Sequence, residues 1–247
     1  MSLLTDIFNT VLYQPLFNAL ILIYQYLPGR DFGLAVIILT VLIRLVLSPL
    51  MAKSIRSQKA LAELQPKIQE VQQKYKEDKE RQLRETMELY RKEKINPLGG
   101  FLPMLIQLPV LIALYLVFWK GLQPGAMENL YSFVSNPGTI NPLFLNVINL
   151  SQANLVLAIL AGIAQFFQTK MTMVKTPSTS SGQAPKKDQT PQFSEKMQKQ
   201  MLYFFPVFTV FILWKMPAAI GLYWIVTTLC SIVQQYFVYK KTYAPTG

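Results

Sequence analysis

A stretch of twenty nearly unbroken apolar residues, from Phe32 to Met51, constrains this chain more than any other feature. Twenty residues is about the length that an α-helix needs to cross a lipid bilayer. One arginine, Arg44, lies well inside the stretch. An arginine in mid-span costs about 2.5–3.5 kcal/mol on insertion scales, so a membrane protein keeps one where water or polar groups receive it. We therefore expect Arg44 to be either a functional residue or an internal tie between helices.

The polar residues of this stretch share one helix face. Thr40, Arg44 and Ser48 recur at every fourth position, which places them above one another on a helix. The rest of the surface is apolar and suits lipid or packed helices. The pattern predicts a spanning helix with one polar stripe.

Composition excludes several classes of site. The 247 residues are 51% hydrophobic and include no histidine and a single cysteine, Cys230. Disulfide frameworks, zinc clusters and histidine-based catalysis are therefore excluded. No Asp, Glu or His lies in any expected span, which disfavours an intramembrane hydrolase, and no Walker-type phosphate loop is present. We expect no enzyme activity, no cofactor and no metal.

Apolar runs alternate with charged and turn-rich segments, which predicts an all-α polytopic membrane protein with five spans. The expected order is an N-terminal interfacial helix (1–29), a first span (30–52), a helical hairpin (53–95), a second span (96–120), an external loop (121–151), a third span (152–172), a flexible linker (173–199), the fourth and fifth spans (200–239) and a tail (240–247). Asn96 followed by Pro97 is typical of a helix start and predicts where the second span begins.

The N-terminal segment is apolar but interrupted by polar residues. These follow a roughly four-residue spacing that forms one stripe on a helix: Asp6, Thr10, Gln14, Asn18 and Gln25. Such a stripe favours an amphipathic helix that lies in the membrane interface. Residues 7–27 are also long enough to span, so both placements stay open.

The segment Lys53–Lys94 is strongly charged and carries two apolar seams. The first is Leu61, Leu64, Ile68, Val71 and Tyr75; the second is Leu83, Met87 and Tyr90. Two short helices with one seam each are expected to pair as an antiparallel hairpin. A docking element and a plain spacer remain equal alternatives.

The net charge of +11 is unevenly distributed. The hairpin segment has 12 basic and 8 acidic residues, and Lys170–Lys199 has 6 basic and 2 acidic. By the positive-inside rule, the hairpin, the linker and the C-terminus are cytoplasmic and the N-terminus is outside. The basic residues are thus explained by topology and by anionic lipid, and we expect no specific nucleic-acid site.

Polar faces recur on several other spans. The residues are Gln107, Gln165, and in the last span Tyr223, Thr227, Ser231 and Gln234. Singly, each is more simply an interhelical hydrogen bond worth about 1–2 kcal/mol. Together with Arg44 they predict a water-filled groove with one fixed positive charge, which lowers the cost of bringing polar peptide into the bilayer.

Several motifs resemble one family in order and spacing. They are QPLF (residues 14–17), TVLIR (40–44), SPL (48–50), LQPKIQ (64–69), KINPLGG with LIQLP (94–109) and GLYWIV followed by QQ (221–235). In these motifs the chain is similar to the YidC/Oxa/Alb family of membrane-protein insertases. The resemblance implies a five-span core, a cytoplasmic hairpin, and a groove in which Arg44 receives polar or acidic parts of incoming segments. It also implies a bacterial inner-membrane location and nascent membrane proteins as clients, with the ribosome and the Sec translocon as candidate partners.

The sequence departs from the family pattern in places. No large domain and no anchor helix precede the expected core, and the lipid-anchoring cysteine of some relatives is missing. The basic tail is short, which disfavours strong ribosome binding on its own. Trp224 follows Tyr223 where the family often has a second tyrosine, so the ring is kept and the hydroxyl lost. We expect Trp224, like Tyr223, to line the groove. A small secondary transporter for an anionic solute is the alternative function, although the spans show no inverted repeat.

Overall fold

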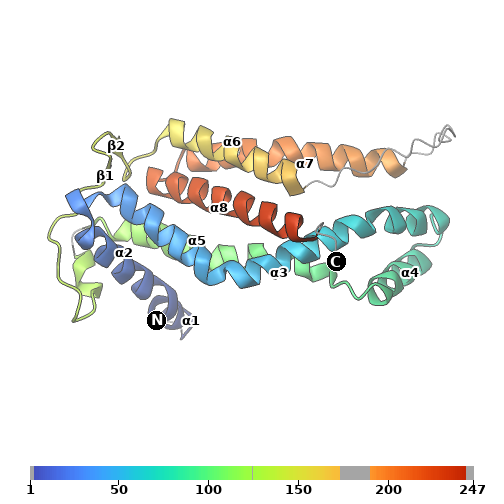
Figure 1. The fold of residues 1–247 in the computed structure, drawn as a ribbon, viewed down its shortest axis with the longest axis horizontal. Helices are drawn as coiled ribbons and strands as arrows, with labels where there is room; N and C mark the ends of the chain where they lie inside the picture. The colour runs from blue at the N-terminus through green and yellow to red at the C-terminus, as the bar shows by residue number, and fades with distance from the viewer. Residues whose placement is uncertain (1–2, 124, 173–189, 243–247) are drawn as a thin grey trace.

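A computed structural model describes residues 3–123, 125–172 and 190–242. Within these ranges the chain is almost entirely helical, and its only β structure is one pair of two-residue strands. Helices α3 (Phe32–Lys74), α5 (Leu102–Lys120), α6 (Leu155–Thr172), α7 (Thr190–Leu213) and α8 (Ala218–Thr242) form an elongated bundle, in which α8 packs against both α3 and α6 (Figure 1). Helix α7 covers α6.

Five helices of the described residues are long and apolar enough to cross a membrane. They are Thr5–Tyr26, Phe32–Lys74, Pro97–Lys120, Leu155–Thr172 and Ala218–Lys240, whereas the apolar part of α7, Leu202–Leu213, is shorter. The expected all-α polytopic fold with five spans is confirmed in class and number. The set differs from the expected one, because the N-terminal helix satisfies these criteria and the fourth expected span does not. The interfacial placement of the N-terminal helix stays a prediction.

The first span and the first hairpin helix form one continuous helix, α3, so the expected boundary near residue 52 is not a break in the backbone. Asp31 starts α3 by accepting a hydrogen bond from the backbone N–H of Leu34 at 2.8 Å. Pro49 and Pro66 lie inside the helix without ending it. A change of composition at Lys53 therefore marks where the helix leaves the apolar layer, not where it ends.

The N-terminal helix consists of α1 (Leu3–Phe8), a π-helical turn (Asn9–Tyr13) and α2 (Gln14–Tyr26). Its polar stripe contacts the 121–151 loop. The Asn18 side chain donates to the Asn129 carbonyl at 3.1 Å and accepts from the Tyr131 N–H at 2.7 Å. The Tyr24 hydroxyl accepts from the Asn141 N–H at 3.1 Å, and the Gln25 amide donates to the Ser135 carbonyl. These loop contacts account for the Asn18 and Gln25 positions of the polar stripe.

The loop itself contains short elements of regular structure. It contains a short 3₁₀ turn (Ala126–Asn129) and strands β1 (Leu143–Phe144) and β2 (Ile148–Asn149), which pair antiparallel. The loop also supports the start of α8, since the Ala219 N–H donates to the Leu150 carbonyl at 3.0 Å.

The apolar core fills the end of the bundle that adjoins this loop. Phe17 of α2, Phe32 of α3, Phe118 of α5, Leu150 of the loop and Ile220 of α8 are at most 2% exposed. The rings of Phe32 and Phe118 meet edge to face with centroids 6.2 Å apart. The opposite end of the bundle has fewer buried apolar residues and contains the candidate site described below.

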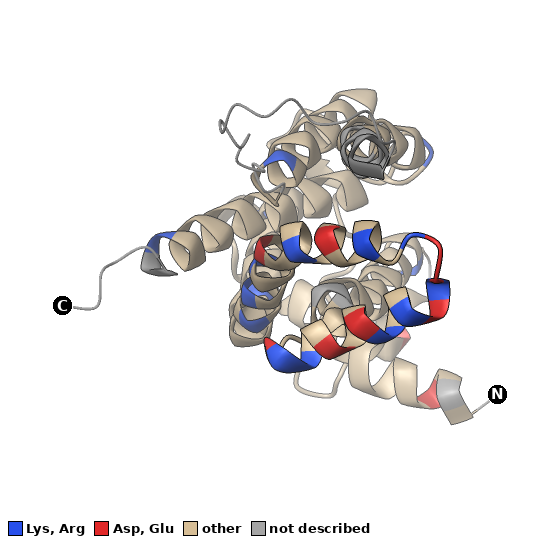
Figure 2. Ribbon diagram, turned by 90° about the vertical axis from the view of Figure 1, so that its right-hand side faces the viewer, with Lys and Arg blue, Asp and Glu red and all other residues tan. Residues whose placement is uncertain are grey.

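The hairpin is formed by the end of α3 and by α4 (Lys79–Lys92), which run side by side beyond the bundle and carry mixed charges (Figure 2). The first expected seam is buried in part: Leu64 and Ile68 are each 4% exposed, whereas Leu61, Val71 and Tyr75 are half-buried. The second seam was predicted wrongly, because Leu83 is 62% and Met87 48% exposed. Helix α4 is rotated so that Gln82 contacts α3, where its amide donates to the Gln72 carbonyl at 2.9 Å.

A 3₁₀ turn (Pro97–Phe101) follows the hairpin and begins at the expected place, where the Asn96 side chain accepts from the Leu98 N–H at 2.9 Å. Most of the expected linker, residues 173–189, lies outside the described residues. The remainder, residues 190–199, belongs to α7 and is helical instead.

Candidate functional site

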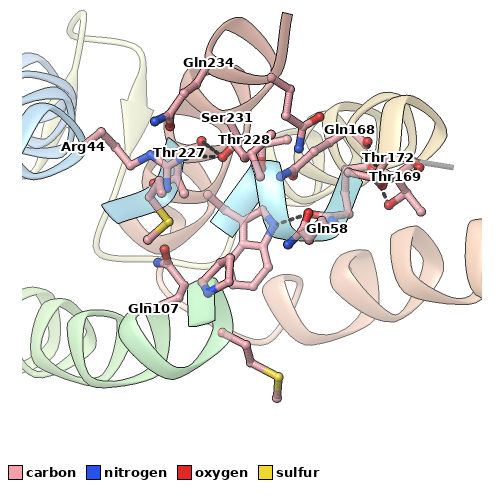
Figure 3. A pocket seen from close by; sticks show the side chains of 17 residues that line it. Arg44, Gln58, Gln107, Gln168, Thr169, Thr172, Thr227, Thr228, Ser231 and Gln234 are labelled. Carbon is pink, nitrogen blue, oxygen red and sulfur yellow. Dashed lines mark hydrogen bonds between the residues drawn. The ribbon is translucent and has the colours of Figure 1, made fainter. Parts of the chain in front are cut away.

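A polar groove of about 340 Å³ lies between α3, α5, α6 and α8. Figure 3 shows polar side chains from these helices converging on it. Among the described residues that line the groove, Arg44 is the only one that carries a charge. The other polar lining residues are Gln58, Gln107, Gln165, Gln168, Thr169, Thr172, Trp224, Thr227, Thr228, Ser231, Gln234 and Gln235.

Arg44 points from α3 toward α8. Its Nη2 donates to the Ser231 hydroxyl, and that hydroxyl donates to the Thr227 carbonyl at 2.9 Å. Within the described chain no carboxylate pairs with Arg44. A guanidinium has five N–H donors in a planar fork that suits carboxylates. One oriented N–H leaves the others directed at the groove, so Arg44 can receive an acidic or polar group there.

Three further hydrogen bonds join α8 to its neighbours around the groove. The Gln234 amide donates to the Ser48 carbonyl of α3 at 2.7 Å, and the Trp224 indole donates to the Gln165 amide oxygen of α6 at 3.1 Å. The Gln107 amide of α5 donates to the hydroxyl of Tyr223. Polar contacts therefore join α3, α5 and α6 to α8 around the groove.

Two buried polar atoms at the groove lack a hydrogen-bond partner among the described residues: Thr227 Oγ1 and Gln235 Oε1. An unsatisfied buried polar group costs about 1–3 kcal/mol. Gln235 is only 3% exposed, so its amide oxygen is buried in the wall of the groove. The many amides and hydroxyls beside one cation make the groove suited to a hydrated interior.

The charged and the uncharged lining residues lie at different positions along α3. The distance from Arg44 to Gln58 along the helix axis is about 21 Å at 1.5 Å per residue. The lone charge lies at the inner end, while the uncharged amides and hydroxyls of Gln58, Gln168 and Thr172 lie toward the hairpin.

Seven of the ten predicted site residues line this groove: Arg44, Gln107, Gln165, Trp224, Thr227, Ser231 and Gln234. Three do not. Thr40 is 1% exposed and its hydroxyl bonds to the Val36 carbonyl of its own helix at 2.6 Å. Ser48 contributes its carbonyl, and Tyr223 is 2% exposed and bonds to the groove residue Gln107. Helical periodicity predicts which residues share a face, but it does not predict which of them are exposed to the groove.

Several lining residues escaped the sequence analysis, although a signal was present for some. On α6, Gln168, Thr169 and Thr172 follow Gln165 at intervals of three, four and seven residues. This spacing continues one helix face and is enough to find them. Thr228 and Gln235 each adjoin a predicted residue on α8. Gln58 lies in the charged part of α3, where nothing distinguishes it from other surface residues.

Comparisons with known proteins found one matching family model and several similar proteins. The family model described as 60Kd inner membrane protein matches residues 22–245. A protein of Fusobacterium nucleatum subsp. nucleatum named membrane protein insertase YidC is 36% identical over 211 residues, which cover 85% of this chain and 87% of that protein. Identically named proteins of Wigglesworthia glossinidia brevipalpis and Syntrophus aciditrophicus are 34% and 35% identical. These matches cover 92% and 93% of this chain, but the chain spans only 36% of the length of each of these two relatives.

Proposed function

The chain belongs to the 60Kd inner membrane protein family, with relatives named membrane protein insertase YidC, and on this premise we propose that it inserts newly made membrane proteins into the bilayer. It is a multi-pass inner-membrane protein. Insertion requires that polar parts of a client enter the membrane, where each unpaired backbone group costs several kcal/mol. The protein must therefore supply a polar surface within the apolar layer.

The observation that carries the proposal is the groove around Arg44. Its single guanidinium has no carboxylate partner in the described chain, and two buried lining oxygens lack donors. A client tail would meet the charge of Arg44, since its carbonyls and carboxylates can accept from the guanidinium, and its N–H groups can donate to the amide oxygens and hydroxyls that line the groove. The apolar segment of the client would then move sideways into lipid, aided by the membrane potential acting on translocated charge.

We propose that the hairpin end of the bundle faces the cytoplasm and that the 121–151 loop faces outward. The mixed but net basic charge of the hairpin supports this orientation under the positive-inside rule. In this orientation the neutral mouth of the groove is cytoplasmic and the apolar core closes its outer end. The hairpin would meet clients or partners first, with the ribosome and the Sec translocon as candidates, and the groove would also act as a folding chaperone for inserted segments.

A secondary transporter for an anionic solute is the second candidate, because a groove cation also suits a small anion. Alternating access normally uses two symmetry-related halves around a midplane site. Here the N-terminal helix, the loop and α8 form one buried core at the outer end, and among the described residues the hairpin end has fewer buried apolar side chains. The groove therefore fits an insertase better than a transporter.

Photocrosslinking tests the proposal directly. A photoreactive residue at position 107 or 234 in the groove should crosslink to ribosome-bound nascent membrane proteins in native membranes. The same residue at Val147, which is 81% exposed on the external loop, is the matched control and should capture none. Equal crosslinking from the groove and from Val147, or uptake of an anionic solute into vesicles without client crosslinks, would contradict the insertase assignment.

A further inference from the structure

A second groove, of about 400 Å³, lies on the outer side of the bundle between α6 and α7. It shares no lining residue with the polar groove and is almost wholly apolar. Ile163 and Phe167 of α6 and Val207 of α7 line it and are 49–69% exposed, so they face the lipid layer.

Gly162 shapes this groove by bringing the two helices into contact. A Cβ atom there would lie 2.4 Å from Cγ2 of Val210 and 3.1 Å from the Pro206 carbonyl oxygen. Because no side chain fits between the backbones at this point, α6 and α7 cross closely. The larger side chains beyond the crossing, including Phe166 and Tyr203, stand as walls on either side of a depression.

The groove ends beside a basic and a phenolic group. Lys170 follows Phe166 and Phe167 by four and three residues, so it continues the same helix face one turn further on. Long helical side chains lean toward the N-terminus of their helix, which directs Lys170 back over the groove. Lys170 is exposed, and no described carboxylate pairs with it. Tyr203 lies at this end too, with its ring 6.0 Å from that of Phe166 and its side chain 63% exposed.

The apolar groove and Lys170 are expected to lie at different depths in the membrane. Helix α6 has 18 residues, and at 1.5 Å per residue it measures about 27 Å, close to the thickness of the hydrocarbon layer of about 30 Å. Lys170 lies two residues before its end and therefore at the level of the lipid headgroups. The groove from Ile159 to Phe167 lies within the hydrocarbon.

We propose that this groove binds one anionic phospholipid, with an acyl chain along α6 and α7 and the phosphate at the Lys170 ammonium and the Tyr203 hydroxyl. Only a ligand that is apolar along its length and anionic at one end matches both zones. A transmembrane helix is about 10 Å across, so a flexible chain fits a depression of this size better. The inference rests on the membrane placement of α6 and is independent of insertase activity.

Lipid binding to the full-length protein in detergent tests the proposal, with native mass spectrometry as the readout. Phosphatidylglycerol is titrated as the anionic probe and phosphatidylcholine as the neutral one. Ile163→Trp fills the groove, and its matched control is Ile112→Trp on α5, a residue 51% exposed. Lys170→Ala removes the charge, Lys170→Arg retains it, and Lys120→Ala removes an exposed lysine at the other end of the bundle.

We expect the wild-type protein and both controls to retain one tightly bound phosphatidylglycerol, which Ile163→Trp loses. Lys170→Ala should weaken phosphatidylglycerol binding about five-fold, as expected for one basic residue at an anionic lipid surface, and Lys170→Arg should restore it. Binding of phosphatidylcholine should not respond to position 170. Equal binding by Ile163→Trp and Ile112→Trp would overturn the proposal, as would equal weakening of both lipids by Lys170→Ala. A photoreactive residue at position 207 that captures client helices and no phosphatidylglycerol would overturn it as well.

Discussion

Arg44 and Ser231 are 187 positions apart in the chain, yet the guanidinium of Arg44 donates a hydrogen bond to the hydroxyl of Ser231. The contact joins α3 to α8 at the inner end of the polar groove. It orients one N–H of the arginine without neutralising its charge. Arg44 is thus positioned as a tie between helices and remains a free cation, and the predictions below separate these two roles.

Ser231→Ala removes the orienting hydroxyl and keeps the charge. A hydrogen bond to a charged group contributes about 1.5–3 kcal/mol, so we expect a lower thermal stability in detergent. Any preference for clients with acidic tails should persist, because the cation is still present. Ser48→Ala is the control, since only the carbonyl of Ser48 is used in the groove. Loss of the tail-charge preference in Ser231→Ala would show that orientation, and not charge, selects clients.

The topology is tested by cysteine labelling in a Cys230→Ser background. We expect residues 2 and 135 to react from outside, and residues 78 and 183 from the cytoplasm. The bonds of Tyr24 and Gln25 to the 121–151 loop place the end of α2 on the same side as that loop. Labelling of residue 2 from the cytoplasm alone would mean that the N-terminal helix spans the membrane and is not interfacial.

Acidic substitutions in the hairpin seam should separate its helices and leave the spans inserted. Leu64 and Ile68 are each 4% exposed in the hairpin part of α3, and each buried apolar side chain is worth about 1.5–3 kcal/mol. Together with Val71→Asp, the changes Leu64→Asp and Ile68→Asp should lengthen the distance between spin labels at positions 70 and 88. The exposed Leu83 and Met87 provide the control, because Asp at either position should not alter that distance. Unfolding of the whole protein by the seam variants would make the hairpin a structural part of the core.

The base of the hairpin should respond to acid. Lys67 Nζ lies 2.5 Å from Glu93 Oε1, and the hydrogen bond and charge of Lys67 hold the pKa of Glu93 below its ordinary value. A lowered pKa in the folded state means that the pair stabilises the hairpin above the ordinary glutamate pKa of about 4.3. This contribution to stability is lost as the pH falls through the lowered pKa of Glu93. Near neutral pH the ion pair should stabilise the hairpin in full. Carboxyl carbon NMR shifts should show a higher Glu93 pKa in Lys67→Gln, and an unchanged titration would remove the ion pair from this account.

Local patterns predicted local structure well. The twenty-residue apolar stretch is helical, Asn96 caps the turn that begins at Pro97, and Leu64 and Ile68 are buried as their spacing indicates. Each of these features depends on residues within a few turns of one another, which is the range over which helical periodicity carries information.

The misses concern contacts between distant segments. The rotation of α4 is determined by Gln82 meeting the carbonyl of Gln72, a polar contact that an apolar seam does not reveal. The polar residues of α2 pair with loop carbonyls and N–H groups more than 100 positions away. From the hydropathy pattern alone, these residues indicate only an amphipathic helix. Likewise Thr40 shares a face with Arg44 but is covered by neighbouring helices, and only the packing decides which of the two reaches the groove.

The central claim is that the charge of Arg44 receives polar client segments, and insertion of matched clients into reconstituted vesicles tests it most directly. The clients differ only in the charge of the translocated tail, and rates are normalised to folded insertase. We expect Arg44→Ala to impair acidic tails more than neutral ones, and Arg44→Lys to retain part of the activity because a point charge still attracts a carboxylate. Equal loss for acidic and neutral tails would contradict the claim and leave Arg44 as a tie between α3 and α8.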